Sequence, residues 1–375
     1  MHIGNKHIHL DFHNHESIAS IAEKFDPDEF ARFMKKTGVD AVNVFAKCTH
    51  GMSYYPTRVG VQHPGLGGRD LLGEMIEALH AQGLRAPVYY CVGWEERLAR
   101  LRPEWRQVRR NGVSGRTLSE TDEMNPDAPG TWHYMDFNNP KYFEHIRSEL
   151  LEIAERYPVD GWWLDILHYH PEAGYSDFNV TFRKTRGIFE FTPTNQRRFE
   201  ALAKDIFGER IRNEVMVKTP RASVFFNANH PPYIESEANP RRLIGHATHW
   251  EIESLASGLW GYHHFPRAAR LAATTNKPWY CMTGRFYRMW GDFGGIKHDR
   301  ALEYEVFRAQ ALGAGVSIGD QLHPAGQVSE PEYEPIRKVL SAYDAAAPLY
   351  EGVKPAFDVG AFYATSMHHD DRIQK

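Results

Sequence analysis

Asp165 closes a strongly apolar stretch of the chain, Val-Asp-Gly-Trp-Trp-Leu-Asp over residues 159–165. A carboxylate at the end of a buried strand lies at the rim of a sheet, where burial raises its pKa and nearby donors lower it. Such a group can act as a catalytic nucleophile. It could instead cap the next segment or pair with an arginine, and Asp160, at the entrance of the same stretch, is expected to be structural.

A second carboxyl group is needed for glycoside hydrolysis, at roughly 5 to 5.5 Å for retention or 6.5 to 9.5 Å for inversion. Glu251 and Glu253 lie two residues apart in an expected strand, so both side chains point to the same side. We favour Glu253 because it is nearer the carboxyl end of that strand. Glu95 is a reserve acid, and either glutamate could instead pair with Arg285.

Recognition of a polyhydroxylated ligand needs aromatic faces beside hydrogen-bond donors and acceptors. The chain is 13% aromatic, with 9 Trp and 18 Tyr, and a large aromatic core would account for that share equally well. Several aromatic residues fall in expected loops rather than in apolar strands. The residues that we expect to bind substrate follow or close strands, and they are His13, His50, Trp94, Asn227, Trp260, Arg285, Trp290 and Asp320.

A metal-dependent alternative rests on His13 and His15, because two alternating histidines in a strand can face one metal ion. An amidohydrolase or phosphoesterase barrel of this kind would need further ligands, for which His230, His249 and Asp320 can be nominated. The chain has 21 His residues, so chance placement near strand ends is easy. No Lys or Glu that could bridge two metals stands on the fourth expected strand. We therefore predict no metal site, and a catalytically silent sugar-binding barrel is the third alternative.

The elements that must position these residues alternate along the chain, as expected for repeated βα units. Strands are expected over residues 7–12, 39–46, 86–92, 159–166, 223–229, 249–254, 278–283 and 314–318. A helix is expected from Pro27, and further helices over residues 70–82, ended by Gly83, and over 141–157. Eight strands in 375 residues predict one (β/α)8 TIM barrel. The catalytic barrel is expected over residues 1–355, with 356–375 starting a further segment or a C-terminal tail.

Charge and composition limit the partners of the chain. Its 44 Lys and Arg against 48 Asp and Glu give a net charge of -4, so no nucleic-acid partner is expected. No stretch approaches the roughly 20 apolar residues of a membrane span. The 3 cysteines form no CxxC pair, which favours neither a disulfide framework nor structural zinc. We expect a cytoplasmic protein with a carbohydrate substrate, and a homo-oligomer is compatible with the sequence.

Five segments together resemble the α-L-fucosidase-like glycoside hydrolase barrels related to families 29 and 151, whose bacterial members are often followed by a β-galactosidase-type trimerisation module. The likeness spans most of the chain. The segments are residues 45–51 (FAKCTHG), 159–165, 253–262, 283–295 with its TGRF and WGDFGG motifs, and 317–324 (SIGDQLHP).

The resemblance implies a retaining, exo-acting hydrolase that removes a terminal sugar through a covalent intermediate on Asp165. It places the acid/base on Glu253, with Glu251 as the fallback, and implies no metal or organic cofactor. The chain departs from the family after the second strand, where two histidines usually follow the lysine. Here Cys48 and Thr49 take those positions and only His50 is nearby. The α-L-fucoside is the first expectation, and the sequence leaves the sugar open.

Overall fold

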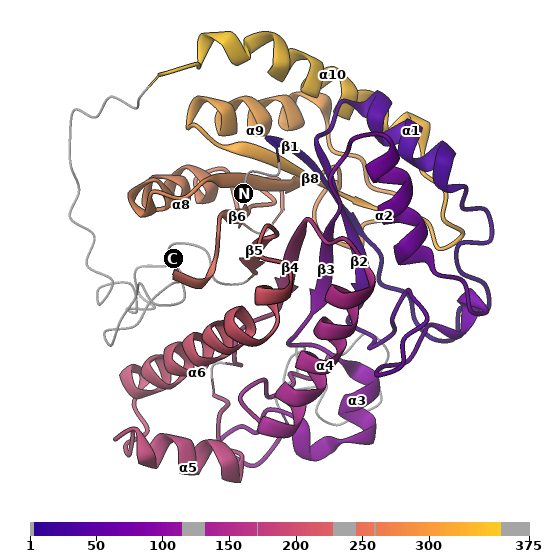
Figure 1. Cartoon of the computed structure of the whole chain (residues 1–375). Coiled ribbons are helices and arrows are strands. Elements are labelled where there is room, and N and C mark those ends of the chain that lie inside the picture. Colours follow the sequence, from indigo (N-terminus) through magenta and orange to yellow (C-terminus); the bar gives the residue numbers. More distant parts are fainter. Residues whose placement is uncertain (1–3, 115–131, 171, 228–244, 259, 354–375) are drawn as a thin grey trace.

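Eight parallel strands form a nearly closed barrel in the computed structural model, which describes residues 4–114, 132–170, 172–227, 245–258 and 260–353 (Figure 1). The strands are β1 (Lys6–Asp11), β2 (Ala41–Lys47), β3 (Pro87–Cys91), β4 (Gly161–Asp165), β5 (Ser223–Phe226), β6 (Trp250–Glu253), β7 (Trp279–Gly284) and β8 (Gly315–Gln321). Their order is β5-β4-β3-β2-β1-β8-β7-β6. The N–H of Thr248 donates to the carbonyl of Val224 at 2.8 Å, which links the two end strands. The predicted (β/α)8 barrel is confirmed.

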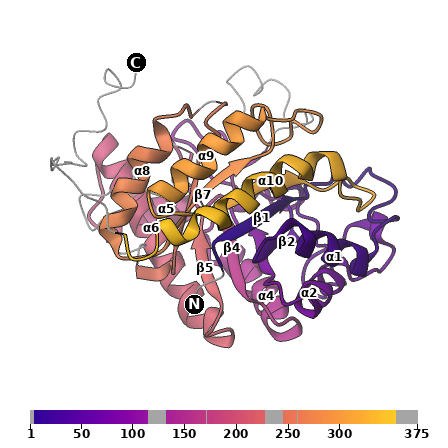
Figure 2. The same cartoon turned by 90° about the horizontal axis from the view of Figure 1, so that it is seen from above.

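Helices surround the barrel and cover its outer face, as the view from above shows for α10, α1 and α2 beside β1 and β2 (Figure 2). The helices are α1 (Pro27–Thr37), α2 (Leu71–Ala81), α3 (Glu96–Leu101), α4 (Pro140–Arg156), α5 (Asp177–Thr185), α6 (Pro193–Glu214), α8 (His264–Ala272), α9 (Asp299–Ala311) and α10 (Glu330–Ala346). None of the described helices has the length and apolar character that crossing a membrane requires.

The first helix begins where the sequence predicts it. The side chain of Asp26 accepts the N–H of Glu29 at 2.7 Å, and Pro27 occupies the first turn, where its missing N–H costs nothing. The helix ends at Gly38, whose φ of 82° is a left-handed conformation that glycine adopts without strain. Local capping chemistry therefore fixes both ends of α1.

Strand positions agree with the sequence to within a few residues, with two differences that affect the site. β8 continues to Gln321, so Asp320 lies inside a strand rather than after it. β5 ends at Phe226, and the last residues of the expected strand, 228 and 229, lie outside the described residues, as do the nominated ligand His230 and the segment 356–375. The long segment between β3 and α4 also contains α3.

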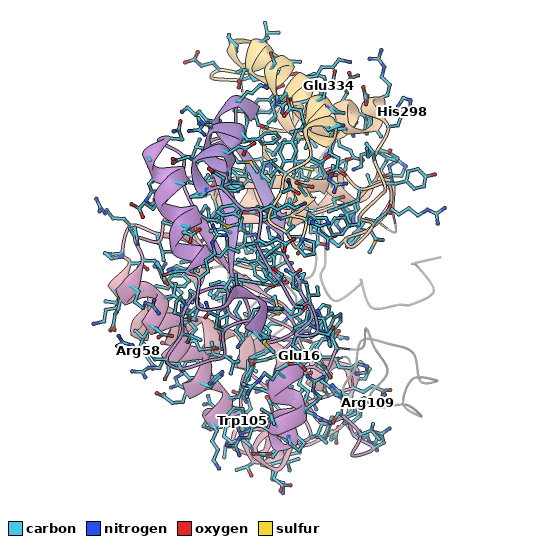
Figure 3. All side chains as sticks on the ribbon, turned by 90° about the vertical axis from the view of Figure 1, so that its right-hand side faces the viewer. Glu16, Arg58, Trp105, Arg109, His298 and Glu334 are labelled. Atoms are coloured by element: carbon cyan, nitrogen blue, oxygen red, sulfur yellow. The ribbon has the colours of Figure 1, made fainter. Side chains whose placement is uncertain are left out.

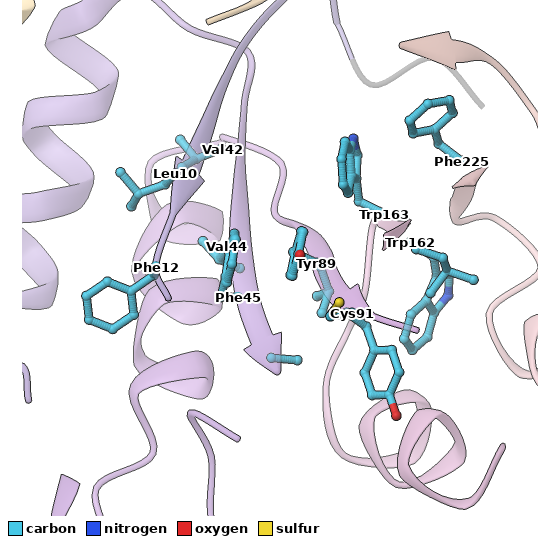
Figure 4. Packing of buried hydrophobic residues seen from close by; sticks show 14 of the residues in the cluster. Leu10, Phe12, Val42, Val44, Phe45, Tyr89, Cys91, Trp162, Trp163 and Phe225 are labelled. Carbon is cyan, nitrogen blue, oxygen red and sulfur yellow. The ribbon is translucent and has the colours of Figure 1, made fainter. Parts of the chain in front are cut away.

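Aromatic side chains from four consecutive strands form a continuous row (Figure 4). The ring of Phe45 stacks on Tyr89 at 3.7 Å, Tyr89 lies 5.4 Å from Trp163, and Trp163 lies 5.5 Å from Phe225. The buried ring of His9 packs against three of these residues. This row makes the barrel interior solid, and it forms a rigid floor beneath the carboxyl ends of the strands.

Candidate active site

Asp165 is the last residue of β4 and lies next to a strained turn. Ile166 follows it with a φ of 54°, a left-handed conformation that is costly for a β-branched residue. Gly93 stands against this turn, and a Cβ at that position would lie 1.9 Å from the carbonyl oxygen of Ile166. The absence of a side chain at Gly93 therefore allows the backbone after Asp165 to bend as it does.

Three donors hold the carboxylate of Asp165, which is 8% exposed. The Tyr89 hydroxyl donates to Oδ2 at 2.5 Å, the amide of Asn227 donates to Oδ1 at 2.9 Å, and the N–H of Ile166 donates to Oδ1 at 2.8 Å. Burial raises the pKa of Asp165, and these hydrogen bonds oppose that rise because they stabilise the charged form. The carboxylate is therefore fixed in one orientation.

Glu253 closes β6 on the other side of Asn227. The Asn227 amide nitrogen donates to its Oε2 at 3.2 Å, and the Trp290 indole N–H donates to its Oε1 at 2.7 Å. Burial, reinforced by the charge of Asp165, raises the pKa of Glu253 to about 7 against these two hydrogen bonds, which lower it. A carboxyl group with that pKa can hold and release a proton near neutral pH.

A single nitrogen atom bridges the two carboxyl groups. Because Nδ2 of Asn227 lies 2.9 Å from Oδ1 of Asp165 and 3.2 Å from Oε2 of Glu253, these two oxygens are at most about 6 Å apart. This bound on one pair of oxygens is compatible with the roughly 5 to 5.5 Å that separates the carboxyl groups of retaining glycosidases. The geometry therefore suits direct attack by one carboxylate.

Glu251 lies one layer deeper in the barrel than Glu253. Its Oε1 is 3.3 Å from Nε2 of His249, and it is 3% exposed. Burial alone would raise the pKa of Glu251, but the hydrogen bond and the charges of His249, His7 and His9 lower it to about 2. Glu251 is therefore ionised near neutral pH and has no proton to give. Neither glutamate contacts Arg285 among the described contacts.

His13 stands at the mouth of the barrel beyond β1. Its Nε2 lies 3.0 Å from Oδ1 of Asp11, and its Nδ1 lies 3.1 Å from the hydroxyl of Thr49. Burial would lower the pKa of His13, but the Asp11 carboxylate outweighs it and raises the pKa to about 10. His13 also faces the ring of Tyr89 at 5.7 Å, so it packs against the residue that supports Asp165.

His50 and Trp94 lie in an aromatic cluster over the ends of β2 and β3. The ring of His50 contacts Trp132 at 4.5 Å, and Trp132 is nearly parallel to Trp94 at 6.3 Å. Burial, together with the nearby His13 and other cations, lowers the pKa of His50 to about 3. A neutral His50 offers both a donor and an acceptor.

Arg285 and Asp320 form a buried ion pair with each other. Glu332 of α10 joins the pair at 3.2 Å, so the arginine faces the surrounding helices. Alternation along β8 explains this direction, because the neighbouring Gly319 faces the interior, where the ring of Trp290 covers it. The structure does not bring these two predicted residues to the carboxyl pair.

Trp260 lies in the loop after β6, 6.4 Å from the ring of His264.

Glu95 is engaged in a second buried ion cluster outside the barrel. The ammonium group of Lys47 contacts Glu95, Glu149 of α4 at 2.7 Å, and the hydroxyl of Tyr90 at 3.2 Å. The strand pairing shifts between Phe45 and Lys47, which pairs Lys47 with the outward-facing Tyr90. Glu95 is therefore committed to Lys47 and lies apart from Asp165.

The nominated metal ligands that the structure describes each have a different partner. His13 pairs with Asp11, and Asp320 pairs with Arg285. The other two are His15, whose Nδ1 lies 2.8 Å from the hydroxyl of Ser17, and His249, which contacts Glu251. These side chains do not converge. Within the described part of the chain, Glu95, His145 and Glu149 have the spacing of metal ligands, and there the ammonium of Lys47 already contacts both carboxylates.

Tyr89 and Trp132 contact the site, and sequence reasoning did not single them out. Tyr89 belongs to an apolar strand, so its sequence context suggests a core residue. It stands two residues before the inward-facing Cys91, and this spacing indicates that Tyr89 also faces the barrel interior. Its hydroxyl reaches the next layer because the Tyr ring is long. Trp132 had no signal in the sequence beyond its residue type.

Comparisons with known proteins agree with this barrel fold. Residues 26–166, which end one residue after Asp165, match the family model described as hypothetical glycosyl hydrolase 6. The chain is 34% identical to α-L-fucosidase isoenzyme 2 from Paenibacillus thiaminolyticus, with a TM-score of 0.81 over 93% of this chain and 50% of that one. The chain thus spans about half the length of that relative. No curated protein matches in sequence.

More distant structures share the fold. An α-fucosidase from Thermotoga maritima is 17% identical, with a TM-score of 0.51 over 88% of this chain and 60% of that one. An α-L-fucosidase of family 29 from Bacteroides thetaiotaomicron is 15% identical, with a TM-score of 0.52 over 88% and 61%. These two matches show the fold, and the family is shown by the 34% identical relative from Paenibacillus thiaminolyticus. The chain is an α-L-fucosidase-like glycoside hydrolase barrel.

Proposed function

We propose that the chain is a retaining, exo-acting α-L-fucosidase-type hydrolase in which Asp165 is the nucleophile and Glu253 the general acid and base. The observation that carries this proposal is the bridge made by Asn227, which holds the two carboxyl groups within reach of one anomeric carbon and its leaving oxygen. The different surroundings of the two groups support their roles. Asp165 is held by three donors, whereas Glu253 has a pKa of about 7.

In the first step, Oδ of Asp165 attacks the anomeric carbon, and Glu253 gives its proton to the oxygen that leaves. The products of this step are a glycosyl ester on Asp165 and a free alcohol. In the second step, the ionised Glu253 takes a proton from water, which attacks the same carbon and releases the sugar and Asp165. Asn227 contacts both carboxyl groups and keeps their relative positions fixed through the two steps.

Support for the fucoside as substrate comes from the relative in Paenibacillus thiaminolyticus, whose name records an α-L-fucosidase. His13 and His50 supply polar groups at the mouth of the barrel, and Trp94 and Trp290 supply aromatic faces. Both ring nitrogens of His13 have partners, Asp11 at Nε2 and the backbone N–H of Thr49 at Nδ1, so His13 holds the Asp11 carboxylate in place at the mouth of the barrel.

The test is hydrolysis of 4-nitrophenyl α-L-fucoside by the wild type and by Asp165→Gly. Wild-type turnover is expected, and the variant should lose it by several orders of magnitude. Azide should restore turnover in Asp165→Gly and yield a fucosyl azide of inverted configuration, because the small anion replaces the missing nucleophile. Near-normal turnover by the variant without azide would remove Asp165 from this role. Binding of fucose without any turnover would favour the silent sugar-binding barrel.

A further inference from the structure

A groove of about 460 Å³ lies beside the barrel mouth, lined by Tyr262, His298, Arg300, Ala301 and Tyr304. It is formed between the loop after β6 and the first turn of α9. Figure 3 shows His298 and Arg109, which lies in the segment between β3 and α4, toward the same edge of the molecule. Neither carboxyl group of the candidate active site belongs to the lining.

One of the two segments that form the groove contacts Glu253, and the other follows Glu253 directly in the chain. Glu253 is the last residue of β6, and Tyr262 lies nine residues later in the loop after this strand. The loop between β7 and α9 contains Trp290, whose indole donates to Glu253, and it ends at His298, which caps α9. The groove is thus continuous in the chain with the side of the active site that carries the proposed acid. In a retaining mechanism the acid stands on the side of the leaving group.

The lining of the groove has the chemistry of a sugar platform. Tyr262 and Tyr304 are 40% and 45% exposed, and their rings meet at 5.4 Å and 76°. Two partly exposed aromatic rings that meet at one place offer an apolar face to a ligand. His298 accepts the N–H of Arg300 at Nδ1, so its Nε2 carries the ring proton and remains a donor. Arg300 adds a planar group with further donors.

We propose that this groove is a subsite for the leaving group, which binds the neutral hexose units from which the terminal sugar is cleaved. The proposal rests on the proposed function, because it takes the acid side of the reaction from Glu253. Two tyrosine faces stack on the apolar faces of the rings, and His298 and Arg300 hydrogen-bond to hydroxyls. A leaving group without a sugar, such as 4-nitrophenol, makes few of these contacts.

The experiment compares the wild type with Tyr262→Ala/Tyr304→Ala on two substrates, 2′-fucosyllactose and 4-nitrophenyl α-L-fucoside. The double variant should lose about tenfold in kcat/KM on the trisaccharide, mostly through KM, and less than about twofold on the aryl fucoside. Tyr350→Ala, another exposed tyrosine outside the groove, is the matched control and should change neither. Equal losses on both substrates, or no loss on the trisaccharide, would overturn the subsite.

Binding separates this inference from the proposed function. Calorimetry with lactose, which lacks the fucose, should detect weak binding to the wild type and about a tenfold weaker signal in the double variant. If the wild type hydrolyses neither fucoside, the proposed function fails while lactose binding still decides the groove. If lactose binds the wild type and the double variant equally, or binds neither, the groove is not a sugar site.

Discussion

Glu251 and Glu253 stand two residues apart on β6 and both point into the barrel, yet their carboxyl groups have very different pKa values. The pKa of Glu251 is lowered to about 2 by its histidine neighbours despite burial, whereas burial raises the pKa of Glu253 to about 7. The sequence favoured Glu253, with Glu251 as the fallback. Their surroundings favour Glu253 as the proton donor, because near neutral pH only this glutamate still carries a proton.

The pH dependence of kcat/KM on an unactivated fucoside follows from this difference. Activity should fall as the pH rises through about 7, because Glu253 must be protonated to act as an acid. It should also fall at low pH, as Asp165 gains a proton at a pH above the usual aspartate range. Glu253→Gln should abolish the alkaline limb, and Glu251→Gln should keep it near pH 7. The reverse result would exchange the roles of the two glutamates.

Tyr89→Phe should impair catalysis while leaving the barrel folded. The change removes the hydroxyl that donates to Oδ2 of Asp165 at 2.5 Å but keeps the ring that stacks on Phe45. A hydrogen bond to a charged group contributes roughly 1.5–3 kcal/mol, so kcat should drop about ten- to a hundredfold.

The acidic limb of the profile distinguishes a positioning role of Tyr89 from a packing role. Loss of the hydroxyl raises the pKa of Asp165 further, so the limb should move to higher pH in Tyr89→Phe. Thermal unfolding of the variant serves as the control for packing. A lower kcat with an unmoved acidic limb would contradict the role assigned to Tyr89.

Lys47→Met should destabilise the protein strongly. The substitution leaves the carboxylates of Glu95 and Glu149 buried together without the ammonium group that neutralises them. Breaking a buried pair in this way costs about 3–5 kcal/mol in the free energy of unfolding. Adding Glu95→Gln and Glu149→Gln should recover much of the loss, because no unpaired charge then remains.

The matched control for Lys47 is the exposed pair of Arg300 and Glu303 on α9. Removing that arginine by Arg300→Met should leave the free energy of unfolding nearly unchanged, because solvent screens an exposed pair. Denaturant unfolding measures all of these variants. Equal effects of Lys47→Met and Arg300→Met would show that the buried cluster is not needed for stability.

The sequence was sufficient for the barrel and for the position of Asp165. Apolar runs of strand length recur eight times, and an aspartate that follows Trp163 and Leu164 in such a run must stand at a strand end. The sequence also predicted that Glu251 and Glu253 point to the same side, because residues two apart in a strand share a face. Local pattern alone carries this information.

Side-chain contacts between strands could not be predicted from the sequence. The direction of Asp320 depends on β8 extending to Gln321, and that of Lys47 on a shift in the pairing of β2 with β3. Neither feature leaves a local pattern. The bridge from Tyr89 to Asp165 depends in the same way on the register of β3 against β4, which pairs Tyr89 with Trp163. Register is set by the whole barrel, so side-chain partners across strands could not be predicted.

Gly319→Ala should move the alkaline limb of the pH profile to higher pH. Gly319 faces the interior, and a Cβ there would lie 2.2 Å from the ring of Trp290, so the indole has to shift. Its hydrogen bond to Glu253 lowers the pKa of that carboxyl group, and weakening the bond lets the pKa rise above about 7. Trp290→Phe should move the limb in the same direction, because it removes the donor directly. Gly294→Ala is the control, since a Cβ at Gly294 meets open space, and it should leave the profile unchanged. An alkaline limb that stays in place in both Gly319→Ala and Trp290→Phe would mean that the indole does not tune Glu253.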